Sequence, residues 1–76
     1  MSVSELAQIL FASELQASAH PTPEEIRDAI TRLQGCAADC AACVAQEAGD
    51  HPEAYAARML WALQEVSRIN LNALPA

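Results

Sequence analysis

Basic residues are scarce in this sequence: it has no lysine, and four arginines stand against ten acidic residues, giving a net charge of −6. Proteins that bind nucleic acid gain most of their affinity by neutralising phosphates with basic side chains. A chain with this charge balance offers no basic face, and an anionic membrane surface repels it as well. We therefore predict no nucleic-acid partner and no membrane partner.

Long apolar runs are also missing, because no stretch approaches the roughly 20 residues that a helix needs to cross a bilayer. The first residues, MSVSELAQILF, lack the positively charged start of a secretory signal peptide. We therefore expect a cytoplasmic protein. Thiols stay reduced in that compartment, and an odd number of cysteines, three, argues against a disulfide framework.

Large side chains are few: the 76 residues include one tryptophan, one tyrosine and one phenylalanine, and much of the 53% apolar fraction is alanine. Alanine favours helix and buries little area. The chain shows no strand pattern. We expect a single all-α domain over residues 1–76 with a thin, closely packed core, for which self-association would supply extra stability.

Helix start signals recur three times. The segments SVSE, TPEE and DHPE each place a capping residue (Ser2, Thr22 or Asp50) three positions before a glutamate, and two of them also place a proline in the first turn. Both features are typical of helix N-termini. We therefore expect helices over residues of about 3–18, 23–34, 36–48 and 51–70.

The two glycines indicate where helices end. Gly49 occupies the position of a left-handed C-terminal cap directly before Asp50. At Gly35 the apolar spacing of three and four residues continues without interruption, which favours one long helix. A helix over residues 23–48 would measure about 39 Å and leave apolar surface uncovered, so we favour a break or kink at Gly35. The expected fold is a small three- or four-helix antiparallel bundle.

The first helix carries apolar residues on two sides. Leu6 and Leu10 share one face, whereas Phe11 and Leu15 project towards the other. Such a helix is either central in its bundle or half-covered by a second chain, and central burial is hard to arrange in so small a domain. We therefore expect a homodimer or a complex with another protein. The predicted interaction surface is Phe11 and Leu15, with Trp61 as a neighbour unless it completes the edge of the core.

The segment GCAADCAACV places Cys36, Cys40 and Cys43 at spacings of four and three, on one face of a helix. Free cysteine commonly behaves as a small buried hydrophobe, and we favour this interpretation. Thiolates are also soft ligands that select Cu(I), so Cu(I) or other soft-metal binding by these three residues is the alternative. An intermolecular disulfide is a third interpretation.

The string CAADCAAC resembles the cysteine-lined helices of bacterial copper-storage four-helix bundles. The resemblance covers these eight positions and implies that the three thiols could ligate Cu(I), with a second copy of the chain completing the site. Zinc is less suited, because a closed structural site needs four ligands. The histidines, His20 and His51, both stand beside prolines at expected helix starts.

The stretch AQEAGDHPEAYAARMLWAL resembles a helix-turn-helix and is similar to the final DNA-reading region of sigma factors. Ala45 and Gly49 match the small residue and the turn glycine of that motif. Tyr55 departs from it, because an aliphatic core residue is usual there. Arg58 is the only basic residue near the start of the would-be recognition helix, whereas a DNA reader needs several basic or amide side chains. DNA binding is therefore the least favoured alternative.

The strings LFASELQ, HPTPEEIRDAI and GDHPEAYAARMLWAL resemble a set of short bacterial proteins without assigned function. This resemblance implies an all-helical domain and supplies no activity or cofactor. Paired carboxylates such as Glu24 and Glu25 stand at helix starts, where capping explains them. We therefore expect no enzyme activity, no catalytic residues and no cofactor. The predicted function is that of a non-enzymatic helical interaction or regulatory module.

Overall fold

The computed structural model describes residues 2–69, and this part of the chain is all-α. Short 3-10 turns, η1 and η2, join the α-helices at two points. The elements are α1 (Val3–Ala12), η1 (Ala17–Ala19), α2 (Pro23–Leu33), η2 (Gln34–Cys36), α3 (Ala37–Asp50) and α4 (Pro52–Arg68). None of these helices is long and apolar enough to span a membrane.

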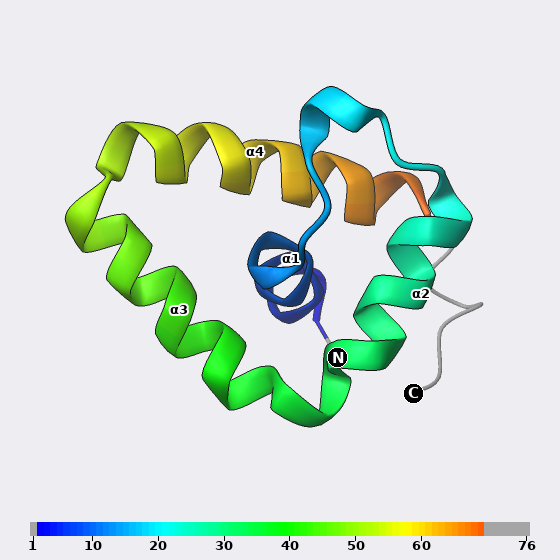
Figure 1. Ribbon diagram of the computed structural model, residues 1–76, viewed down its shortest axis with the longest axis horizontal. Helices are drawn as coiled ribbons and strands as arrows, with labels where there is room; N and C mark the ends of the chain where they lie inside the picture. Colours follow the sequence, from blue (N-terminus) through cyan, green and yellow to red (C-terminus); the bar gives the residue numbers. More distant parts are fainter. Residues whose placement is uncertain (1, 70–76) are drawn as a thin grey trace.

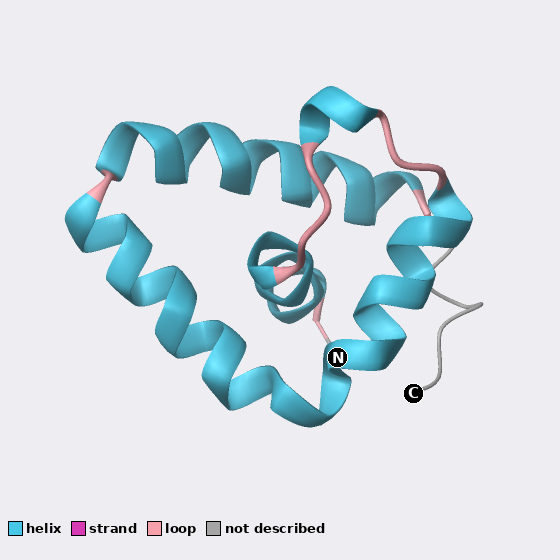
Figure 2. Cartoon of the chain, viewed as in Figure 1, coloured by secondary structure: helices cyan, strands magenta, loops and turns pink. Residues whose placement is uncertain are grey.

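Helix α1 occupies the middle of the molecule. Figure 1 looks along α1, while α2, α3 and α4 form a frame around it, and α1 contacts all three. The expected antiparallel arrangement is therefore not confirmed, because the central helix crosses its neighbours instead of running beside them. The connections between helices are short except for the segment from α1 to α2, which carries η1 over the outside of α4 (Figure 2).

The central position of α1 explains its two-sided apolar pattern. The core cluster takes Leu6, Ala7, Ile9 and Leu10 from α1, Ile26 and Ile30 from α2, Cys40 from α3, and Ala62, Val66 and Ile69 from α4 and its end. Each large aliphatic side chain buried in this way contributes about 1.5–3 kcal/mol. Phe11, on the other side of α1, is only 6% exposed. The expectation that Phe11 forms a contact surface is wrong, because this chain's own helices cover α1.

Helix α1 ends at Ala12, earlier than the predicted residue 18. The Ser13 backbone N–H and hydroxyl both donate to the Leu10 carbonyl, at 3.1 and 2.6 Å. The Leu15 N–H then donates to the Ser13 hydroxyl at 3.3 Å. Serine forms such local bonds readily, and they compete with the next helical turn. The chain therefore leaves the helix at Ser13.

The first two helix starts are confirmed. Ser2 accepts a hydrogen bond from the Glu5 N–H, and Thr22 forms a complete capping box with Glu25. The third is wrong, because α3 continues through Gly49 to Asp50, and the N-cap of α4 is His51, whose side chain makes no capping bond.

The two glycines differ from each other. Gly49 does not adopt the left-handed conformation that the sequence suggested, since no described glycine has a positive φ. At Gly35 the expected break is present: α2 ends at Leu33, the chain forms η2, and α3 begins at Ala37. Residue 70, the predicted end of the last helix, lies outside the described residues, and α4 ends at Arg68.

Candidate functional site

The three cysteines do not share one environment. Cys40 is 5% exposed and belongs to the core cluster, whereas Cys36 and Cys43 are exposed. Cys36 stands exposed at the N-cap of α3, four residues before the buried Cys40, and its backbone is not helical. Cys43 follows Cys40 by three residues, which turns it about 60° away from Cys40 on the side opposite the buried Val44.

This geometry supports the structural interpretation for Cys40. Burial, followed by the neighbouring Cys36, Asp39 and Cys43, raises the pKa of the Cys40 thiol. The thiol therefore stays neutral at physiological pH, whereas a metal ligand or nucleophile is a thiolate. Over residues 2–69, no three His, Cys, Asp or Glu side chains gather in a group that could hold a metal ion. Cu(I) binding by the three cysteines stays a prediction, for which a second copy would have to bring further thiols.

Arg58 of α4 makes the most extensive polar contacts between helices. Its Nε donates to the carbonyl of Phe11 at 2.9 Å, and its Nη2 donates to the carbonyls of Ser13 and Leu15 at 3.0 and 2.9 Å. These carbonyls lie at and beyond the C-terminal end of α1, where helical partners are missing and the dipole is negative. Arg58 therefore holds the end of α1 and the following turn against α4.

Aromatic rings complete the surroundings of Arg58. Its guanidinium carbon lies 5.3 Å from the centre of the Phe11 ring and 5.1 Å from that of Trp61. The Phe11 ring also contacts Tyr55, with the ring centres 5.7 Å apart. Partial burial lowers the pKa of Arg58, which nevertheless remains charged because the ordinary value is so high.

These contacts bear on the helix-turn-helix alternative. Arg58 was the only basic residue placed to meet DNA, and its fork is committed to the backbone of its own chain. A phosphate contact through Nε or Nη2 would compete with these bonds. The structure therefore weakens the DNA-binding interpretation further. A sequence signal for the structural role did exist, since an arginine in the apolar part of a helix commonly satisfies backbone carbonyls.

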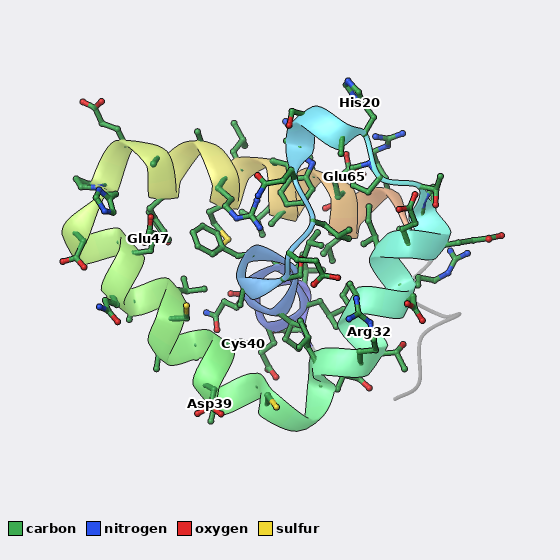
Figure 3. All side chains as sticks on the ribbon, in the orientation of Figure 1. His20, Arg32, Asp39, Cys40, Glu47 and Glu65 are labelled. Carbon is green, nitrogen blue, oxygen red and sulfur yellow. The ribbon has the colours of Figure 1, made fainter. Side chains whose placement is uncertain are left out.

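Of the predicted surface residues, Trp61 and Leu15 are both half-buried and pack against the core. Trp61 separates two open hollows between α4 and the segment around η1. One, of about 410 Å³, lies next to Ala57, and the other, of about 370 Å³, lies towards His20 and Glu65. Figure 3 shows His20 pointing outwards from that segment, on the same side of the molecule as Glu65.

The most exposed large apolar side chain was not identified from the sequence. Leu60, on the outside of α4, is 58% exposed and is the one large hydrophobic residue in this class among residues 2–69. Ala56 and Ala57 are exposed beside it, one turn earlier, and half-buried Leu63 follows one turn later. We name these four residues the outer strip. Near its end, Leu63 lines an open hollow of about 420 Å³.

Charge is distributed unevenly around this strip. The sequence between Arg32 and Arg58 contains no arginine. It holds four acids, which are Asp39, Glu47, Asp50 and Glu53. By contrast, Arg32 contacts Glu14 at 2.7 Å and Asp28 at 3.5 Å, which lowers the pKa of Glu14. Arg68 contacts Glu65 at 3.1 Å.

We name the junction of α3 and α4 the acidic corner, after its exposed Asp50 and Glu53. An open hollow of about 400 Å³ lies against both residues. Together, the outer strip and the acidic corner form the candidate functional surface. Comparison with known proteins gives no match to this chain among protein-family models, curated proteins or solved structures.

Proposed function

We propose that this protein is a non-enzymatic helical interaction module that binds another protein through the outer side of α4. The exposure of Leu60, at 58%, is the observation that supports this proposal. The surface differs from the one predicted from sequence, because Phe11 is buried and α1 is central. Trp61, which was predicted as a neighbour of the Phe11 and Leu15 surface, packs against the core and stands next to Leu60 in α4.

A single exposed leucine is common on soluble proteins and means little by itself. Here Leu60 is continuous with small and apolar neighbours at helical spacing, so a partner can approach the α4 backbone closely along the outer strip. Trp61 lies beside this strip and is stacked by Arg58. An aromatic side chain fixed before binding loses little conformational entropy in a complex, which is typical of an interface anchor.

Other features fit the same proposal. The adjacent carboxylates Glu24 and Glu25 are exposed in the first turn of α2, where Glu25 completes the capping box. Capping and the helix dipole account for this pair without acid–base chemistry.

Cys36, Cys40 and Cys43 are all free, which suits the reducing cytoplasm that we propose as the location.

Site-specific photocrosslinking in cells tests this function. A photoreactive phenylalanine analogue replaces Leu60 in one variant and Ala42, exposed on the outside of α3, in the control. We expect a discrete adduct from position 60 that position 42 does not give. An adduct of twice the mass of the chain would identify a second copy as the partner. Identical adducts from both positions, or none from position 60, would contradict the proposal.

A further inference from the structure

The charges near the outer strip indicate which chemistry its partner carries. Asp50 and Glu53 are exposed and form no ion pair within residues 2–69, whereas the two arginines of α4, Arg58 and Arg68, contact the α1 end and Glu65. Glu53 precedes Leu60 by seven residues, so it lies on the same side of α4 about 10 Å away. A single bound helix could therefore touch both the apolar side chain of Leu60 and the carboxylate of Glu53.

We propose that the outer strip binds a cationic amphipathic helix of another protein, an inference that rests on the proposed function. Apolar side chains of that helix pack on Leu60 and Leu63, and its lysines or arginines lie against Asp50 and Glu53 at the acidic corner. The small side chains of Ala56 and Ala57 leave room on α4 for the side-chain ridges of the incoming helix. The opposite charges accelerate encounter and fix the direction of the bound helix.

Charge also separates this partner from two others. A second copy of the chain carries the same net charge of −6, so two copies repel each other overall. Nucleic acid and anionic lipid surfaces are repelled by the same carboxylates. A cationic helix is attracted by them, and this attraction extends over about 10 Å at moderate salt.

Peptide titration tests the proposal directly. The probes are a short leucine–lysine peptide with amphipathic helical spacing, a scrambled peptide of the same composition, and a leucine–glutamate peptide with the amphipathic spacing. Binding is followed by fluorescence anisotropy and by amide chemical shifts of α4. We expect the amphipathic cationic peptide to bind and to perturb α4, with affinity falling roughly tenfold or more between about 0.05 M and about 0.5 M salt.

Matched variants separate local from overall charge. Asp50→Asn with Glu53→Gln removes two acids at the corner, and Glu24→Gln with Asp39→Asn removes two exposed acids in the first turns of α2 and α3. Both double variants have the same net charge, but we expect only the first to weaken binding by roughly tenfold. Leu60→Ser should abolish most of the remaining affinity. Circular dichroism confirms that each variant is folded.

Several outcomes would overturn the inference: absence of binding, equal binding of the scrambled or the acidic peptide, or equal effects of the two double variants. Its failure can be distinguished from failure of the proposed function. A position-60 adduct with a partner that lacks a cationic helix, or with a second copy, refutes this inference while the interaction module stands. Absence of any adduct specific to position 60 contradicts the proposed function itself.

Discussion

Helices α3 and α4 cover the same central helix from two sides, but with different side chains. α4 contributes Arg58, Trp61 and Val66, which combine ring contacts, hydrogen bonds and aliphatic burial. α3 buries Cys40 and Val44, and α4 likewise fully buries only Ala62 and Val66, but most of the remaining side chains of α3 are alanine-sized or acidic. The central helix is therefore covered on both sides, but the polar and aromatic contacts to its C-terminal end come from α4.

This difference shows how a short, alanine-rich chain completes a core. Small side chains let α3 approach α1 closely, but they bury little area and offer no polar contact to the end of α1. The arginine on α4 supplies that contact, because the C-terminal carbonyls of a helix need donors. Helix α4 also carries the outer strip, so the proposed binding surface lies on the helix that makes the polar contacts to the end of α1.

The largest expected effect comes from removing the arginine contact. Arg58→Ala leaves the carbonyls of Phe11, Ser13 and Leu15 without their donor and removes the cation from between two rings. We expect the free energy of unfolding to fall by about 2–4 kcal/mol, which is much of the stability of a small domain. Thermal denaturation followed by circular dichroism measures this loss.

Two controls keep this prediction testable if the alanine variant does not fold. Arg58→Lys retains the charge but cannot donate to three carbonyls with a planar fork, so we expect an intermediate loss. Arg27→Ala removes an arginine from α2 instead and should change stability by less than about 0.5 kcal/mol. Equal melting temperatures for Arg58→Lys and the unsubstituted protein would show that the geometry of the fork contributes nothing.

Local signals predicted the helices well but not their arrangement. Ser2 and Thr22 cap their helices as expected, because each bond involves residues three apart. The first helix ends early because Ser13 turns back to Leu10, and Arg58, more than forty residues away in sequence, then takes up the exposed carbonyls. Helical periodicity carries no information about such a distant donor. It also cannot distinguish a helix covered by its own chain from one covered by a partner.

The candidate site was predicted less well than the fold. Phe11 and Leu60 are both large and apolar, and sequence reasoning placed the wrong one on the surface. Phe11 lies away from the face of Leu6 and Leu10, which predicted that it was exposed, yet it packs against α4 and is only 6% exposed. Leu60 lies outside the apolar stripe of α4 and faces solvent. Only the packing of the other helices around α1 shows that Phe11 is buried and Leu60 is exposed.

A smaller effect compares two cysteines on α3. Cys40→Ser places a hydroxyl in the core next to α1, whereas Cys43→Ser changes an exposed position on the same helix. We expect Cys40→Ser to lower the free energy of unfolding by about 1–2 kcal/mol, because the buried hydroxyl loses its water. Cys43→Ser should change it by less than about 0.5 kcal/mol. Chemical denaturation under reducing conditions measures both, and equal losses would contradict the different burial of the two thiols.

The smallest expected effect is a pH dependence that originates at Cys40. Burial, together with Cys36, Asp39 and Cys43, raises the pKa of this thiol above its ordinary value of 9.0. Below that value the thiol is protonated in both the folded and the unfolded chain, so its contribution to stability is fully present. As the pH rises further, the unfolded chain loses the proton first, and the free energy of unfolding falls.

Denaturant titrations between neutral pH and about pH 10 test this dependence in the unsubstituted protein and in Cys40→Ala. The unsubstituted protein should lose more stability on the alkaline side, because only it releases the Cys40 proton on unfolding. Cys43→Ala, which keeps the buried thiol, should retain the alkaline loss. Parallel curves for the unsubstituted protein and Cys40→Ala would show that Cys40 is as well hydrated as an exposed thiol. In that case α3 does not close over α1, and the contrast between the two sides would be larger than the structure shows.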